Sequence, residues 1–277
     1  MQEETPKESI DLQAYLARIE LRKLVAPNLQ TLRNVIAAHV ATIPFENLDP
    51  FLGVSPALDL ASVQRKLVHD HRGGYCFEQN LLLGSALRAI GFSVTDLAAR
   101  VLWGQPDDAI TARNHMLLRI DLDEDAWLAD VGFGGATPTG PLWLVPDMEQ
   151  VTPHGPYRLQ RRSEDDWRLQ RCTDDAWETL YRSDLRPQYP VDYRAGNWWT
   201  STHPESYFVT SLTAARAPAG RRLTLRNREF TVRAEDGAEE RRTLHDAGEI
   251  REVLRDAFLI RLPDHPQLDS KLDRLPA

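Results

Sequence analysis

The sequence predicts an α+β fold in which a helical bundle comes first, an antiparallel sheet or barrel second and a mixed α/β segment last. Apolar residues recur with the period of a helix as far as Gly91 and alternate with the period of a strand after it, and no βαβ alternation follows. No low-complexity linker separates the segments, so we expect them to pack as one unit. With 42% hydrophobic and 27% charged residues among 277, the composition excludes disordered, collagen-like and disulfide-scaffold proteins.

Four helices are predicted in the N-terminal part. Apolar residues recur at i, i+3, i+4 and i+7 from Asp11 to Val25, and a second such stripe runs from Leu29 to Val40. A third helix is predicted to begin at the capping residue Ser62 and to stop before Gly73-Gly74. A fourth is predicted from Cys76 to Gly91, because glycine suits the position that follows a helix. Together these helices indicate a bundle.

Strands are predicted to follow Gly91, the first with one apolar face made of Leu97, Ala99, Val101 and Trp103. The next two, His115–Ile120 and Ala126–Val131, flank a polar connection at residues 121–124. Three later runs lie near residues 157–161, 167–171 and 177–181. They contain the near-copies RLQRRSEDDW and RLQRCTDDAW, which we interpret as two turns of one β-meander.

The C-terminal part is predicted to contain a hairpin and a helix. The hairpin turns around Asn227-Arg228. The helix lies near Asp246 to Leu259, and Asp246 with Glu249 can form a capping box at its start.

The net charge, the first residues and the cysteine and histidine spacing exclude several classes of function. Lysine and arginine number 33 against 41 acidic residues, a net charge of −8 that repels phosphate backbones, so we expect no nucleic-acid partner. The polar first residues contain no secretory signal, and no run approaches the about 18 apolar residues that span a bilayer. We therefore expect a cytoplasmic protein without a membrane partner. No CxxC pair is present, and His69 and His71 would point apart on a helix, so we predict no metal.

Cys76 is the first candidate for chemistry. In the stretch RGGYCFEQN it opens a predicted helix directly after two glycines. Unsatisfied N–H groups and the dipole at a helix N-terminus stabilise an anion, and the thiolate is the nucleophilic form of cysteine. The alternative is a small buried hydrophobic residue. Cys172, on an edge of the meander, is assigned to packing.

His115 is the candidate base, because the other face of its strand is apolar. If the two strands pair with residue numbers that sum to 245, His115 lies opposite Asp130 and Met116 lies opposite Ala129. Opposite Cβ atoms are roughly 4.5–5.5 Å apart, close enough for a carboxylate to orient an imidazole. A structural histidine is the alternative, but the combination of Cys76, His115 and Asp130 favours a catalytic triad.

The motifs that contain Cys76, His115 and Asp130 are similar to those of a known enzyme family. RGGYCFEQN, the histidine of RNHMLLRID and the aspartate of LADVGFGG, together with IPFENL upstream and STHPESYF downstream, closely resemble the arylamine N-acetyltransferase family over nearly the whole chain. The resemblance implies that Cys76 carries the acyl group, His115 is the base and Asp130 orients it. It implies a helical bundle at 1–91, a β-barrel at 92–190 and an α/β lid at 191–277, with a catalytic core related to papain and transglutaminases.

The resemblance also implies the substrates. The acetyl group of acetyl-CoA passes in a ping-pong cycle through S-acetyl-cysteine to arylamines, arylhydrazines or N-hydroxyarylamines, which suits a role in xenobiotic metabolism. Aromatic residues of the matching motifs would line the amine pocket, and two glycines and a histidine would face the coenzyme: Phe45, Phe133 and Phe208, then Gly132, Gly134 and His203. Core packing is the alternative for Phe45, a tight turn for the glycine run and a surface position for His203. Structural roles are favoured for Arg72 and Glu78.

Other functions share this chemistry. A related acyltransferase or amide synthase would use malonyl-CoA or a carrier-bound acyl chain with the same triad. A cysteine hydrolase or transglutaminase is disfavoured, because the papain-type cysteine signature is absent and His115 follows Cys76 by only 39 residues. A non-catalytic binding protein would contain an inert Cys76. The sequence does not indicate the oligomeric state or the physiological acceptor.

Overall fold

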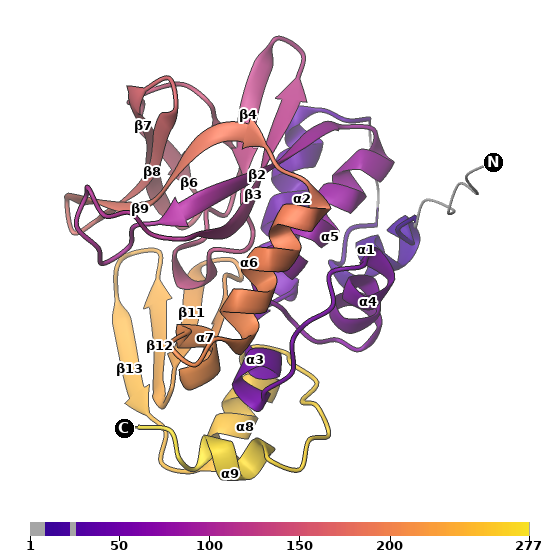
Figure 1. The fold of residues 1–277 in the computed structure, drawn as a ribbon, viewed down its shortest axis with the longest axis vertical. Helices are drawn as coiled ribbons and strands as arrows, with labels where there is room; N and C mark the ends of the chain where they lie inside the picture. The colour runs from indigo at the N-terminus through magenta and orange to yellow at the C-terminus, as the bar shows by residue number, and fades with distance from the viewer. Residues whose placement is uncertain (1–8, 23–25, 277) are drawn as a thin grey trace.

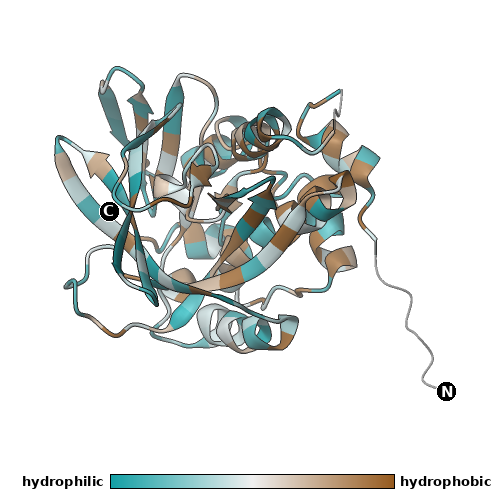
Figure 2. Cartoon of the chain, turned by 90° about the horizontal axis from the view of Figure 1, so that it is seen from above, coloured by the Kyte–Doolittle hydropathy of each residue, from teal (hydrophilic) through white to brown (hydrophobic). Residues whose placement is uncertain are grey.

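The computed structural model describes residues 9–22 and 26–276 and has the α+β architecture that the sequence predicts. An eight-stranded antiparallel sheet and a five-stranded sheet lie beside a group of N-terminal helices, and the helix at residues 190–202, labelled α6, runs between them (Figure 1). Apolar residues gather where helices face the sheets, whereas polar residues cover the outer turns (Figure 2). Within the described ranges, no helix is long and apolar enough to cross a membrane.

The four predicted N-terminal helices are present, with corrections at two ends, and the short helix α3 between the second and third of them was not predicted. They are α1 (Leu12–Arg18), α2 (Leu29–Thr42), α3 (Leu48–Leu52), α4 (Leu60–Gln64) with a π-helical turn (Arg65–His69), and α5 (Cys76–Ile90). α1 ends at Arg18, well before Val25, which lies outside the described residues. Ser62 is not the cap of α4: the Asp59 carboxylate accepts the Ser62 N–H at 2.8 Å and starts the helix earlier. α5 ends at Gly91, as predicted, with φ of 111°.

The eight-stranded sheet curls until its two edges meet. Its order is β5 (Leu142–Trp143), β4 (Asp125–Ala129), β3 (Arg113–Leu122), β2 (Ser93–Val101), β9 (Ala176–Pro187), β8 (Asp166–Thr173), β7 (Gly155–Ser163) and β6 (Gln150–Thr152). The Gln150 side chain accepts the Trp143 N–H at 2.7 Å and donates to the Trp143 carbonyl at 2.8 Å, which joins the two edge strands. The predicted meander is confirmed in β7, β8 and β9. Trp103 was misplaced, since it follows the end of β2 and is 45% exposed.

The five-stranded sheet contains one strand from the N-terminal part of the chain and four from the C-terminal part. Its order is β1 (Phe45–Glu46), β10 (Thr213–Arg216), β11 (Arg221–Arg226), β12 (Glu229–Ala234) and β13 (Glu239–Thr243). The helices α8 (Ala247–Asp256) and α9 (Leu268–Leu272) share its apolar core. The hairpin at Asn227 is as predicted, and Asp246 caps α8 by accepting the Glu249 N–H at 2.9 Å. The predicted capping box is not complete, because the Glu249 side chain accepts the N–H of His245 rather than that of Asp246. Three helices of this part, α6 (Pro190–Thr202), α7 (Tyr207–Thr210) and α9, were not predicted, and α6 packs against β3 and α3.

The predicted register of β3 and β4 is wrong by two residues. Leu118, not Met116, lies opposite Ala129, and the pairs sum to 247. The hairpin turns at Asp123, whose φ of +55° suits a tight turn, so the turn is one residue further along than the sequence analysis assumed. Because side chains alternate with period two, an even error leaves every residue on its predicted face. His115 and Asp130 therefore still meet, as diagonal rather than direct neighbours.

Candidate active site

Cys76 is the first residue of α5, and its side chain is buried. The glycines before it let neighbouring groups approach closely. A Cβ at Gly73 would lie 2.1 Å from the Pro44 carbonyl oxygen, and one at Gly74 would lie 2.6 Å from Oε2 of Glu78. The Gly74 carbonyl accepts the Glu46 N–H of β1 at 3.0 Å. The glycine pair therefore fixes the helix start against β1.

A cluster of buried charges ties the segment before Cys76 to the helices. Lys66 Nζ lies 2.7 Å from carboxylate oxygens of both Asp49 and Glu78. Arg72 lies 2.8 Å from oxygens of both Glu46 and Asp49. Burial raises the pKa of Glu78 to about 7, although Lys66 opposes the rise. The second oxygen of Glu78 accepts the N–H of the residue before Cys76 at 3.2 Å. The ion pair predicted for Arg72 is present, and Glu78 contacts Lys66 and the start of α5, as structural roles for both residues require.

His115 and Asp130 form a buried pair, with His115 Nε2 2.7 Å from Asp130 Oδ2. Burial by itself lowers the pKa of His115, but the charge and hydrogen bond of Asp130, together with contact with Cys76, outweigh it and raise the pKa to about 10. Since Asp130 occupies Nε2, Nδ1 is the ring nitrogen left to face Cys76. The His115 ring is held between Phe133, edge-on at 5.1 Å, and Tyr181 at 5.0 Å. The thiol of Cys76, the imidazole of His115 and the carboxylate of Asp130 therefore form a series of contacting side chains.

Asn80 fixes Asp130 in place through several hydrogen bonds, and its sequence position did not single it out as a site residue. Its Nδ2 donates to Asp130 Oδ1 at 3.0 Å and to the Met116 carbonyl at 2.7 Å, and its Oδ1 accepts the Val131 N–H at 3.1 Å. Asp130 Oδ1 also accepts the Gly132 N–H at 2.9 Å. Burial raises the pKa of Asp130, but these contacts and the charge of His115 lower it below the ordinary value. Asn80 lies one helical turn after Cys76 on the same face, and this spacing was the available signal.

The two glycines expected at the coenzyme pack against site residues. A Cβ at Gly132 would lie 2.6 Å from Cα of Cys76 and 3.1 Å from its carbonyl oxygen, so only glycine lets this segment contact the helix start. Gly134 has φ of +69°, a left-handed conformation, and a Cβ there would lie 3.5 Å from the Phe45 ring.

The aromatic candidates divide into two groups. Phe45 and Phe208 lie together, with ring centroids 6.0 Å apart, and Tyr75 meets Phe208 edge-on at 5.8 Å. Phe133 lies instead beside His115. His203 directly follows α6 and stacks on Trp199 of that helix, with ring centroids 5.1 Å apart. Cys172 lies half-buried in β8.

Histidine, cysteine, aspartate and glutamate residues do not form a group of three or more that could hold a metal ion anywhere in residues 9–22 and 26–276.

Comparison with known proteins gives one consistent result. The family model described as N-acetyltransferase matches residues 28–267. The arylamine N-acetyltransferase of Escherichia coli is 43% identical over 254 residues, which cover 91% of this chain and 90% of the relative. An arylamine N-acetyltransferase / N-hydroxyarylamine O-acetyltransferase of Salmonella typhimurium is 39% identical, with the same coverage of each chain. The arylamine N-acetyltransferase of Mycobacterium marinum in complex with CoA superimposes with a TM-score of 0.92 at 38% identity, covering 96% of this chain and 100% of that one.

Proposed function

Because the chain belongs to the arylamine N-acetyltransferase family, we infer that it transfers the acetyl group of acetyl-CoA to arylamines, and we propose that Cys76 carries that group between the two substrates. The observation that supports this assignment is the continuous chain of contacts from Cys76 through His115 to Asp130, at the start of a helix. In this proposal Cys76 is the nucleophile, His115 moves the proton and Asp130 holds the imidazole.

In the first half-reaction the thiolate form of Cys76 is the nucleophile and the protonated ring of His115 is the acid. Asp130 keeps His115 protonated at neutral pH. The sulfur of Cys76 bonds to the acetyl carbon of acetyl-CoA, and the bond from that carbon to the coenzyme sulfur breaks. Nδ1 of His115 gives its proton to the departing thiolate. The result is S-acetyl-cysteine, a neutral imidazole and free CoA, with one thioester exchanged for another.

The second half-reaction restores the starting state. An arylamine is weakly basic and therefore uncharged at neutral pH, so its nitrogen can attack the acetyl carbon directly. The bond from that carbon to the Cys76 sulfur breaks, and Nδ1 of His115 accepts the proton that the nitrogen loses. The imidazolium and the thiolate are then present again. Asn80, by fixing Asp130, keeps the receiving nitrogen pointed at the reacting atoms.

The substrate contacts are also proposed. Phe45 and Phe208 lie together and offer apolar surface to an aromatic acceptor, and Phe133 covers the imidazole from the side. Gly132 keeps the segment after Asp130 close to Cys76, whereas Gly134 packs against Phe45. Both glycines, together with His203 directly after α6, are proposed to lie beside the coenzyme. N-hydroxyarylamines and arylhydrazines are proposed as further acceptors. We place the reaction in the cytoplasm, where reducing conditions keep a thiol free.

Steady-state kinetics with both substrates varied test this cycle. A ping-pong transfer through Cys76 predicts parallel double-reciprocal lines, and Cys76→Ser should abolish transfer while the protein stays folded. Cys172→Ser is the matched control and should transfer normally. Converging lines would contradict the acyl-enzyme, and near-normal turnover by Cys76→Ser would contradict the assigned nucleophile. Turnover with malonyl-CoA but not with acetyl-CoA would contradict the assigned donor.

A further inference from the structure

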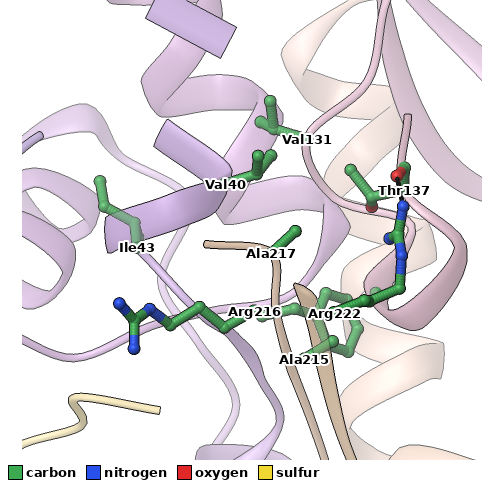
Figure 3. Close-up of a pocket in the computed structure, with 10 residues that line it drawn as sticks. Val40, Ile43, Val131, Thr137, Ala215, Arg216, Ala217 and Arg222 are labelled. Atoms are coloured by element: carbon green, nitrogen blue, oxygen red, sulfur yellow. Dashed lines mark hydrogen bonds between the residues drawn. The ribbon is translucent and has the colours of Figure 1, made fainter. Parts of the chain in front are cut away.

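The segment at residues 131–137 is held against the nucleophile by contacts of its own. Gly132 packs on the backbone of Cys76. Further along, the segment borders a small pocket beside α2, β10 and β11, where Arg222 donates to the Thr137 carbonyl at 3.0 Å (Figure 3). These contacts fix one neighbour of Cys76. The start of α5 is held separately, by side chains that connect it to α6.

Tyr75, the residue before Cys76, reaches from the start of α5 to α6. It is fully buried, and its hydroxyl donates to Oδ1 of Asn197 in α6. Its ring meets Phe77 edge-on at 5.7 Å and Phe208 edge-on at 5.8 Å. Burial raises the pKa of Tyr75, so the hydroxyl keeps the proton that it donates. Both the ring and the hydroxyl of Tyr75 are therefore held in place.

Asn197 is itself fixed by its neighbours. The residue is buried, and its Nδ2 donates to the Pro56 carbonyl at 2.9 Å. Its backbone carbonyl accepts the Ser201 hydroxyl at 2.7 Å, and Oγ of Ser201 lies 2.7 Å from Oγ of Ser55. Because the side-chain amide is bonded at both ends, it presents its oxygen to Tyr75 in one orientation.

Gly196, the preceding residue of α6, contacts neighbours of both Cys76 and His115. A Cβ at Gly196 would lie 3.1 Å from Cζ of Phe77 and 3.8 Å from Cα of Asn114. Phe77 directly follows Cys76 in the chain, whereas Asn114 directly precedes His115. The Asn114 carbonyl also accepts the thiol of Cys76 at 3.7 Å. Consecutive residues of α6 therefore pack on the segments that carry the nucleophile and the base.

We propose that Asn197 is a positioning residue. Through the Tyr75 hydroxyl it sets the distance from the sulfur of Cys76 to the imidazole of His115. The inference rests on the proposed function, since it concerns the same nucleophile and base. A misplacement of about 1 Å can cost about a hundredfold in rate. Without the bond between Tyr75 and Asn197 the start of α5 can shift by part of that distance, so we expect acetyl transfer to slow about tenfold or more.

Tyr75→Phe tests this role, because it removes the hydroxyl and keeps the ring. The rate at which Cys76 gains an acetyl group is followed by intact mass at saturating acetyl-CoA, together with kcat and KM for transfer to an arylamine. The acetylation rate and kcat should each fall about tenfold or more, and KM for acetyl-CoA should stay near that of the wild type. Tyr193→Phe is the matched control. It removes a buried hydroxyl of the same helix, which donates to the Leu97 carbonyl at 3.0 Å, so it should lower the melting temperature similarly and acetylate at the wild-type rate.

A double-mutant cycle shows whether Tyr75 and Asn197 act through one bond. Asn197→Leu should slow acetylation as Tyr75→Phe does, and the double variant should be no slower than the slower of the two. The inference is overturned if Tyr75→Phe acetylates within about threefold of Tyr193→Phe, or if the two single losses multiply in the double variant. A wild type that gains no acetyl group would contradict the proposed function itself and this inference with it.

Discussion

Asp130→Asn tests the part that the carboxylate plays in holding His115 charged. Oδ2 of Asp130 lies 2.7 Å from His115 Nε2, and Oδ1 accepts N–H groups of Asn80 and Gly132. Asparagine can keep the second set of bonds through its oxygen, which turns its NH₂ group toward His115. The ring must then accept at Nε2 and carry its proton on Nδ1, so it cannot accept a proton from the amine.

The size of the effect follows from the pKa of His115. It is about 10 in this environment, against about 6.5 for an exposed histidine. Without the carboxylate charge, burial dominates, and the pKa should fall to about 6.5 or lower. A fall of about 3.5 corresponds to about 5 kcal/mol, and at pH 7.5 it reduces the imidazolium from nearly all molecules to about one in ten or fewer.

Two assays read the consequence. Alkylation of Cys76 by iodoacetamide at pH 7.5 should slow about tenfold or more, because fewer molecules contain the imidazolium that favours the thiolate. Acetyl transfer should lose more, about 10²- to 10⁴-fold in kcat/KM, since the tautomer is also wrong. Asp121→Asn, an exposed change in the neighbouring strand, is the control and should behave as the wild type. Alkylation and transfer within threefold of the wild type in Asp130→Asn would refute the reasoning.

Three further predictions concern stability. Gly132→Ala should lower the melting temperature by several degrees and slow acetyl transfer, because its Cβ would lie 2.6 Å from the backbone of Cys76. Gly140→Ala is the control and should do neither, since nothing lies within 4 Å of a Cβ at that position; equal effects of the two variants would contradict the packing argument. Arg72→Met should lower the free energy of unfolding in urea by about 3–5 kcal/mol, because it leaves the buried Glu46 carboxylate without its cationic partner. The double variant with Glu46→Gln should recover part of this loss, and a loss below about 1 kcal/mol in Arg72→Met would count against the charged cluster. Burial lowers the pKa of His39 to about 4, so the unfolded chain takes up this proton before the folded protein does. The free energy of unfolding should therefore drop by about 3 kcal/mol as the pH falls from about 6.5 to 4, and His39→Gln should remove this drop. An unchanged pH dependence in that variant would contradict the assignment.

The fold order and the three site residues could be predicted because they depend on local signals. Helical and strand periods locate α5, β3 and β4, and the even register error kept His115 and Asp130 on one face. The division at residues 91 and 190 stays a prediction. β1, from the first segment, pairs with β10 from the last, so contacts cross both boundaries.

Other features could not be read from the sequence. α6 buries mainly polar side chains, among them Asn197, Thr200 and Ser201, so it has no apolar stripe to reveal it. The charged cluster around Arg72 includes residues from four elements, which tertiary contacts such as the bridge between β1 and Gly74 bring together. Sequence spacing contains no signal for such contacts.

The intact mass after brief exposure to acetyl-CoA without amine tests the central claim most directly. We predict that the wild type and Cys172→Ala each gain one acetyl group, that peptide mapping places it on Cys76, and that Cys76→Ala gains none. Addition of an arylamine should then remove the group and release the acetylated amine. An acetyl group on Cys76→Ala, or one mapped to Cys172 in the wild type, would contradict the account.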